Sequence, residues 1–181
     1  MLTLNGKSIF LQEFTEDRLS DPSYLMWMRD LEVVTGIYRL EYLLPLSPAE
    51  IEKYVHRVMK SERDFFFSIH EKNSGLFIGT VKLGHVDWRT GSADVGILIG
   101  DRGSRGRGYS TDAVRTICDY GIHKLSLRKL TGGTASNNHA MIKCFEKVGF
   151  VREGTLRKKL LIDGEYVDHI LFGLFREEFG S

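Results

Sequence analysis

The segment DRGSRGRGYSTDA, residues 101–113, has a composition that suits anion binding better than core packing. Its glycines allow main-chain N–H groups to converge on one point, and a helix that starts just after them adds the positive end of its dipole. Such a concave set of amides binds a pyrophosphate without needing a lysine. The same composition also fits a surface turn with a solvated arginine cluster, and the segment by itself leaves both interpretations open.

Two common phosphate-binding motifs do not fit this segment. Gly103 and Gly108 have the spacing of a nucleotide-triphosphate loop, but Tyr109 stands where that loop requires a lysine. Read from Gly106, a dinucleotide-binding fingerprint requires a third glycine where this chain has Thr111. If the segment binds a diphosphate, it therefore does so in another way than these two motifs.

The elements that must position this segment alternate between strands and helices. Apolar residues recur at three- and four-residue steps after the glycines and predict a helix that starts near Gly108. Elsewhere the patterns predict strands at 8–14, 64–70, 76–86, 92–99, 128–134, 151–162 and 166–175, and further helices at 21–34, 47–60 and 138–148. The strands between 64 and 99 are expected to form an antiparallel meander, and the whole chain, 1–181, a single α/β domain.

Length and composition limit the classes of protein. The 25 Lys and Arg nearly balance the 24 Asp and Glu, so no general basic field favours nucleic acid or a membrane surface as a partner. No run approaches the roughly 18 apolar residues of a membrane span, and the start lacks the pattern of a secretion signal. Cys118 and Cys144 lie in apolar helical patterns and are predicted to be buried free thiols. We therefore expect a cytoplasmic protein, and the scattered histidines predict no metal site.

Two motifs, in order along the chain, resemble the GNAT acetyltransferase superfamily. Its pyrophosphate motif, Q/R-x-x-G-x-G/A, is matched from Arg105 to Ser110, with serine in place of the last small residue. Its second motif, an asparagine followed by a helix that ends in E-K-x-G-F, is matched by Asn138 and FEKVGF. Further stretches, such as WMRDLEVV and EGTLRKKLLIDGEYVDHILFGL, resemble the branch with ribosomal-protein N-terminal, spermidine and nucleotide-amino-sugar N-acetyltransferases.

This resemblance implies both a fold and a cofactor site. The fold would be a mixed, mostly antiparallel twisted sheet, splayed in the middle and flanked by helices, with acetyl-CoA wedged into the split. The strand at 92–99 would offer its backbone to the pantetheine arm. Residues 101–110, here called the glycine loop, would hold the pyrophosphate, and Asn138 would approach the pantetheine from the other side. A lysine or a loop arginine would meet the ribose phosphate. The residues expected around acetyl-CoA are Ile97, Leu98, Ile99, Arg105, Gly106, Arg107, Gly108, Tyr109, Ser110, Asn138, Phe145 and Lys147.

Acetyl transfer to an amine requires a group that removes a proton from the ammonium and a proton for the departing thiolate. Asp94, on the less apolar side of the cofactor-facing strand, is a candidate base, and a solvated strand-end carboxylate is an equal alternative. His85 is a second candidate, although a half-buried structural histidine fits its position better. Many relatives have tyrosine at the position of Phe145 and some have serine at that of Met141, so the sequence names no proton donor here.

The acceptor is the least determined part of this interpretation. The region 21–34 resembles the substrate-side helix of the same branch, so Trp27, Arg29, Asp30 and Glu32 are expected near the acceptor, although tryptophan is also common in cores. The stretch WMRDLEV resembles sugar-modifying members, and we expect a nucleotide-linked amino sugar as the acceptor. A protein N-terminus, a polyamine and an acetyl-CoA sensor without turnover are the alternatives. The protein is expected to be a monomer or a homodimer.

Overall fold

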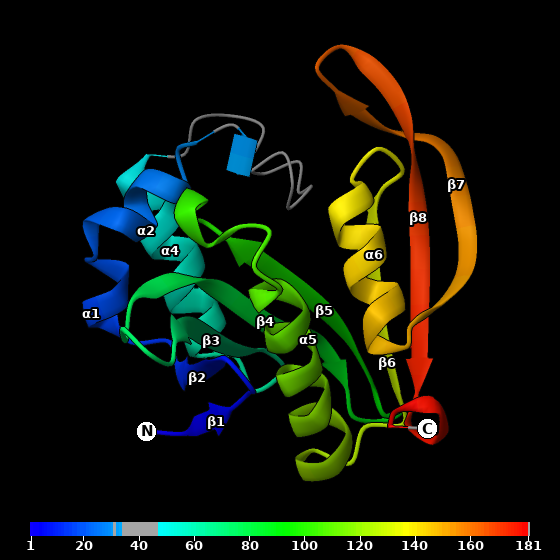
Figure 1. The fold of residues 1–181 in the computed structure, drawn as a ribbon, viewed down its shortest axis with the longest axis horizontal. Coiled ribbons are helices and arrows are strands. Elements are labelled where there is room, and N and C mark those ends of the chain that lie inside the picture. The colour runs from blue at the N-terminus through cyan, green and yellow to red at the C-terminus, as the bar shows by residue number, and fades with distance from the viewer. Residues whose placement is uncertain (31, 34–46, 181) are drawn as a thin grey trace.

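The computed structural model describes residues 1–30, 32–33 and 47–180, and its centre is one eight-stranded sheet (Figure 1). The strand order is β1-β2-β3-β4-β5-β6-β8-β7, with β5 and β6 parallel and the other neighbours antiparallel. The strands are β1 (Thr3–Asn5), β2 (Ile9–Glu13), β3 (Phe65–Glu71), β4 (Phe77–Asp87), β5 (Ser92–Ile99), β6 (Lys129–Ala135), β7 (Val151–Ile162) and β8 (Glu165–Phe175). The helices are α1 (Glu16–Leu19), α2 (Pro22–Trp27), α4 (Pro48–Met59), α5 (Tyr109–Asp119) and α6 (His139–Val148), with short turns η2 (Arg102–Ser104), η3 (Tyr120–Lys124) and η4 (Arg176–Glu178). This architecture confirms the expected mixed, mostly antiparallel sheet with flanking helices.

The sheet splits between β5 and β6. Only three residue pairs join these strands, and the last of them is Asp94 with Thr131. Beyond that pair β5 continues to Ile99 and β6 to Ala135, and the two strands diverge (Figure 1). The edge of β5 that faces the split therefore lacks a paired strand from residue 95 onward, which leaves main-chain polar groups available for a ligand.

The buried residues form two clusters, and β5 contributes to both. Ala93 and Val95 belong to the larger cluster with α5 and α6, whereas Leu98 belongs to the cluster with α2 and α4. This arrangement explains why β5 alternates between two unlike sets of residues, because successive side chains of a strand point to opposite faces.

Local signals in the sequence start and end several elements as predicted. Ser47 and Glu50 form a reciprocal capping box at the start of α4, which satisfies two main-chain donors of the first turn. Gly149 ends α6 in the left-handed region, with φ of 111°. Asp163 and Gly164 join β7 to β8 with φ of 50° and 81°, as a type I′ turn requires.

The helix that the sequence predicts at 21–34 is longer than the one observed, since α2 ends at Trp27. The N–H groups of Arg29 and Asp30 bond to carbonyls three residues back, which tightens the chain into a turn. The Asp30 carboxylate then accepts the N–H of Glu32 at 3.0 Å, the bond by which an aspartate begins a new helical turn. The short elements β1 and α1 were not expected at all.

The carboxylate of Asp112 ties the start of α5 to the N-terminal strands. It accepts the main-chain N–H groups of Lys7, Ser8 and Ile9 at 2.9, 2.6 and 3.2 Å. Because Asp112 lies in the first turn of α5, these bonds fix the end of the helix that follows the glycine loop.

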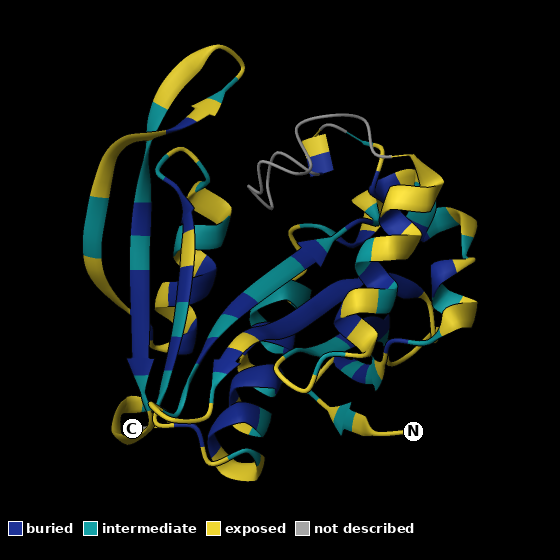
Figure 2. Cartoon of the chain, turned by 180° about the vertical axis from the view of Figure 1, so that it is seen from behind, coloured by how far each residue is buried: buried dark blue, intermediate teal, exposed yellow. Residues whose placement is uncertain are grey.

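The outer strand β7 has an irregular middle. Between Leu156 and Leu160 its register against β8 shifts, and Lys158 has a φ of 50°. The N–H of Lys158 donates to the Asp168 carboxylate at 2.8 Å, which gives this aspartate a structural role. The β7–β8 hairpin extends beyond the rest of the sheet, and much of β7 is exposed (Figure 2).

Both cysteines are buried and unpaired, as predicted, and burial raises the pKa of each thiol. Among the residues that the structure describes, no helix is long and apolar enough to cross a membrane. The same residues contain no group of three or more His, Cys, Asp or Glu that could hold a metal ion.

Candidate active site

The glycine loop has the geometry of an anion site. Gly106 and Gly108 have φ of 74° and 84°, and Gly108 is the N-cap of α5 without a side-chain cap. The N–H of Asp112 bonds to the Gly108 carbonyl at 3.1 Å, so the N–H groups of the turn before it remain available at the positive end of the helix. These donors match the oxygens of a diphosphate, so the residues present fit the pyrophosphate of acetyl-CoA.

Two pockets follow the split away from this loop. The loop pocket, about 270 Å³, is lined by the end of β5, the glycine loop and the start of α6, including Arg105, Ser110 and Asn138. The split pocket, about 120 Å³, lies deeper between β5 and β6 and includes Asp94 and Thr134. The two pockets share Ile97, Leu98 and Met141, so they lie next to each other along the split.

Most residues expected around acetyl-CoA line one of these two pockets. Those in the loop pocket are Ile97, Leu98, Ile99, Arg105, Gly106, Tyr109, Ser110 and Asn138, and Phe145 lines the split pocket. Arg107, Gly108 and Lys147 are exposed and line neither pocket. Lys147 lies in the last turn of α6, whereas the loop pocket meets the first turn, so the structure does not bring it to the expected position.

Asn138 has a structural duty as well as a place in the loop pocket. Its Oδ1 accepts the N–H of Met141 at 3.1 Å and so caps α6. The cap occupies the oxygen only, and the side-chain NH2 group remains a donor on the side of the split opposite β5.

Tyr109 is not set up as an acid. Its hydroxyl donates to the Glu71 carboxylate, and this hydrogen bond raises the pKa of Tyr109. The pKa of Glu71 is lowered, first by the hydroxyl of Ser74 and then by that of Tyr109. The pair therefore holds the glycine loop against the end of β3.

Asp94 lies where β5 and β6 separate. It belongs to the last β5–β6 pair and lines the split pocket, and the Thr131 hydroxyl lies 3.2 Å from its Oδ1 and donates to it. A carboxylate at the closed end of a split can take a proton from an amine that enters the split pocket.

His85 lies outside both pockets. It is exposed, with φ of 55°, at an irregularity in the β4–β5 pairing between Gly84 and Asp87. An inserted residue of this kind bends the strand and redirects the side chain, which explains why strand alternation misplaced it. The geometry therefore favours Asp94 over His85 as the base.

Lys82 is a buried residue of the split pocket that the sequence analysis missed. It is 6% exposed, and its Nζ lies 3.2 Å from Asp64 Oδ1 and 3.3 Å from the Tyr54 hydroxyl. The opposite residue on β5 is Gly96, which leaves the ammonium room beside the pocket. The only signal in the sequence was one charged residue within the apolar run of β4.

Replacing Lys82 with methionine is expected to lower the free energy of unfolding by about 3 kcal/mol, because Asp64 then loses the partner of a buried ion pair. Urea unfolding measures this change. The matched control is Arg102→Met, whose ion pairs are exposed and contribute less than about 1 kcal/mol. Equal losses of unfolding free energy in the two variants would contradict the assignment of Lys82 and Asp64 as a buried ion pair.

The dependence of the free energy of unfolding on pH in acid provides a second prediction. Burial by itself raises the pKa of Asp64, but the Ser61 hydrogen bond and the charge of Lys82 outweigh it, and the net pKa is lowered. The pKa of Asp64 in the folded protein lies below the unfolded value of about 3.9. The charged carboxylate therefore contributes to the free energy of unfolding above that pH, and the contribution is lost as pH falls through the folded pKa. Asp64→Asn should therefore flatten the dependence of unfolding free energy on pH below about 4, as urea titrations at several pH values would show.

The residues expected near the acceptor separate in the structure. Trp27 is 4% exposed and packs on Phe77, with ring centroids 5.0 Å apart. A Cβ at Gly100 would lie 2.0 Å from its indole, so the glycine makes room for this core residue. Arg29 is exposed and lines a surface hollow with Asp30, outside the loop and split pockets. The structure thus places neither Trp27 nor Arg29 at the acceptor.

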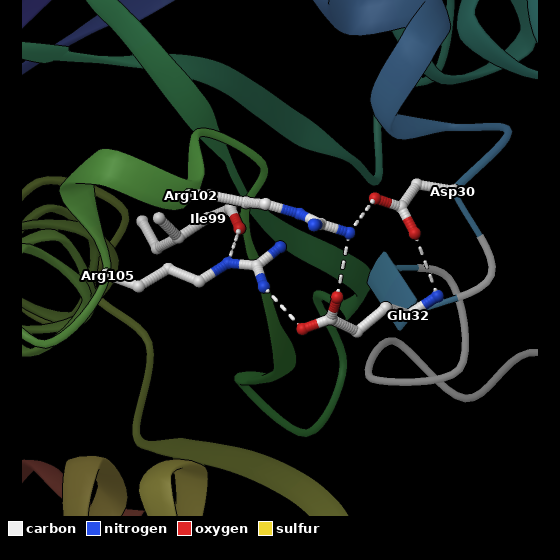
Figure 3. A network of polar contacts seen from close by, with 5 residues as sticks. All are labelled: Asp30, Glu32, Ile99, Arg102 and Arg105. Atoms are coloured by element: carbon white, nitrogen blue, oxygen red, sulfur yellow. Dashed lines mark hydrogen bonds and ion pairs between the residues drawn. The ribbon is translucent and has the colours of Figure 1, made fainter.

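Asp30 and Glu32 instead contact arginines of the glycine loop (Figure 3). Arg102 lies 3.1 Å from Asp30 and 2.9 Å from Glu32, and Arg105 lies 2.8 Å from the other oxygen of Glu32. Arg105 also donates to the Ile99 carbonyl at 3.3 Å. This network joins the segment after α2 to the rim of the loop pocket.

Glu32→Gln is expected to tighten CoA binding by up to about fivefold, because it removes a negative charge beside the diphosphate site and frees Arg105. Calorimetric titration with CoA at low salt measures the gain, which should shrink at high salt. The exposed Glu165→Gln, at the distant β7–β8 turn, is the control and should change nothing. Weaker binding of Glu32→Gln would contradict the prediction.

Comparisons with known proteins agree with this geometry. The family profile described as "Acetyltransferase (GNAT) domain" matches residues 9–151. A Bacillus subtilis protein named "Probable N-acetyltransferase" is 31% identical over 129 residues, which cover 71% of this chain and 70% of the relative. The spermidine N(1)-acetyltransferase of Escherichia coli is 30% identical over 128 residues, 71% of this chain and 65% of the relative.

A solved structure supports the fold. The crystal structure of spermidine N-acetyltransferase from Vibrio cholerae in complex with CoA and spermine has a TM-score of 0.86 and 20% identity, and covers 96% of this chain and 99% of its own. The split sheet and the glycine loop therefore occur together with a family profile that spans most of the sequence. This chain belongs to the GNAT acetyltransferase family.

Proposed function

We propose that this chain transfers the acetyl group of acetyl-CoA to a primary amine of a small aliphatic molecule of the polyamine type. The observation that carries the proposal is the adjacency of the loop pocket and the split pocket, which share three lining residues. A diphosphate at the glycine loop and a pantetheine arm along β5 would direct a thioester toward the pocket that contains Asp94.

The acceptor part of the proposal departs from the amino-sugar expectation. The named relatives include spermidine acetyltransferases, and this supports the polyamine alternative over the amino sugar. The stretch WMRDLEV, which suggested a sugar, contributes a core tryptophan and two carboxylates that pair with loop arginines. Residues with those duties give little support to a sugar site.

The chain's own residues would divide the work as follows. The amides of the glycine loop and the NH2 group of Asn138 would hold and orient acetyl-CoA, which supplies the activated acetyl group. The carboxylate of Asp94 would take the proton that an ammonium must lose before it can attack. Apolar neighbours such as Met141 and Phe145 would exclude water from the thioester.

The test is a panel of acceptors that contains spermidine, a nucleotide-linked amino sugar and a peptide with a free N-terminus. Thiol release is followed together with mass spectrometry of the product, and spermidine is expected to give the highest kcat/KM. A preference for the amino sugar or the peptide would overturn the acceptor class. Micromolar CoA binding with no acetylated product from any amine would favour the sensor alternative.

A further inference from the structure

One buried hydroxyl in the split pocket has no partner. Among the described residues, Thr134 Oγ1 is the buried side-chain polar atom without a hydrogen bond. Thr134 is 4% exposed and lines the split pocket. An unsatisfied buried hydroxyl costs free energy, so its presence in the split pocket points to a partner that arrives with the ligand.

The strand β6 directs this hydroxyl toward α6. A Cβ at Gly132 would lie 2.5 Å from the Phe145 ring, so the face of β6 that carries residue 132 faces α6. Thr134 is two residues further along and shares that face. Met141 and Phe145, one helical turn apart on α6, line the same pocket. Thr134 therefore supplies a hydroxyl in a wall whose other members have no proton to give.

The position along the split is equally specific. Thr134 is three residues beyond the last paired residue of β6, Thr131, just as Ile97 is three residues beyond Asp94 on β5. The hydroxyl thus lies across the split from Ile97 and Leu98, two of the residues that line both pockets. A thioester that enters from the loop pocket must pass this junction.

The two tyrosines of the split pocket and its lysine are less suitably placed as donors. Tyr24 lies on α2 and is buried in the cluster over the first half of the sheet. The Tyr54 hydroxyl lies 3.3 Å from Lys82 Nζ, which also contacts Asp64. Both tyrosines come from the helices over the first half of the sheet, whereas Thr134 belongs to the wall formed by β6 and α6.

We propose that the Thr134 hydroxyl donates to the sulfur of CoA and relays the last proton of the reaction, an inference that rests on the proposed function. Attack by the neutral amine forms the C–N bond and breaks the thioester C–S bond, whose electrons remain on sulfur. The hydroxyl proton passes to sulfur while Oγ1 receives the proton that the nitrogen loses. The products are the amide and the free thiol, and threonine is unchanged.

The matched pair Thr134→Val and Thr134→Ser tests the role of the hydroxyl. Valine keeps the shape and removes the oxygen, whereas serine keeps the oxygen. The first readout needs no acceptor: the thiol of bound CoA is titrated through the ultraviolet absorbance of its thiolate. A donor to a charged sulfur is worth enough to shift that pKa, so Thr134→Val should raise it by about one pH unit relative to wild type and Thr134→Ser should not.

Steady-state kinetics provide the second readout. Thr134→Val should lower kcat by about 10- to 100-fold, and Thr134→Ser should stay within about threefold of wild type. Calorimetric Kd values for CoA within about twofold of wild type show that each variant folds and binds. An identical thiol pKa in all three proteins, or equal losses of kcat in both variants, overturns the inference.

These outcomes separate the inference from the proposed function. If wild type acetylates no amine but the bound thiol pKa still depends on the hydroxyl, the acetyl-transfer proposal fails and the contact between Thr134 and sulfur stands. If Thr134→Val acetylates spermidine at the wild-type rate with an unshifted thiol pKa, the function stands and the role of Thr134 is wrong.

Discussion

Replacing Gly108 with valine is expected to weaken CoA binding by about 100-fold or more. Gly108 has a φ of 84° and caps α5, and a β-branched residue is strongly disfavoured in that conformation. Relaxation of φ would rotate the amides that must converge on the diphosphate, and each lost hydrogen bond to a charged oxygen is costly. Calorimetric titration with CoA measures the effect.

The structure also shows how the substitution would act. Apart from its neighbours in the chain, no heavy atom of the described residues lies within 4 Å of a Cβ at Gly108, so the effect comes from backbone conformation and not from a clash with the unliganded protein. Gly75→Val is the matched control, because Gly75 has a φ of 70° and equally open surroundings, in a turn away from the pockets. The two variants should lose similar stability, and only Gly108→Val should lose CoA affinity. Equal CoA affinity in Gly108→Val and wild type would refute the loop assignment.

Replacing Asp94 with asparagine is expected to lower kcat by about 10²- to 10⁴-fold at neutral pH, the range typical of a lost general base. The loss should shrink as pH rises toward the amine pKa of about 10, because solvent then supplies the neutral amine. The KM for acetyl-CoA should change little, since Asp94 lines the split pocket and not the loop pocket. Initial rates against pH, with saturating acetyl-CoA, provide the measurement.

The control for Asp94 is Asp119→Asn, which removes an exposed carboxylate from the last turn of α5. It should leave the pH profile unchanged. If Asp94→Asn keeps the wild-type kcat at neutral pH, the solvated-carboxylate interpretation is the better one and the proton leaves by another route.

The elements that the sequence predicted well are those whose signals are local. The meander of β3, β4 and β5, the apolar face of α5 and the β7–β8 turn each follow from side-chain period or from residues at a turn. The end of α2 was missed because the chain turns after Trp27 while Trp27 and Met28 remain buried in the core. Apolar residues at helical spacing do not show where such a turn begins. Strand β1 and helix α1 are too short for any period to emerge.

The parts of the candidate site that are formed by the backbone of a local motif could be predicted from the sequence. The parts that are formed by side chains from distant segments could not. The glycine loop and Asn138 carry motifs, so their place at one pocket could be expected. Glu32 meets Arg105 and Lys82 meets Asp64 only after the chain folds, and no spacing along the sequence announces either pair. Thr134 gave no signal because one threonine in a strand is ordinary, and its lack of a partner is a property of the folded chain.

The break in β7 has a consequence for how molecules of this protein can meet. A long outer strand offers a row of unpaired main-chain groups on which a strand from another copy could grow. Here the extra residues opposite Asp168 interrupt that row halfway, and Lys158 puts a positive charge at the break. An intruding strand would lose its register there, so this edge of the sheet resists the strand stacking that leads to fibres.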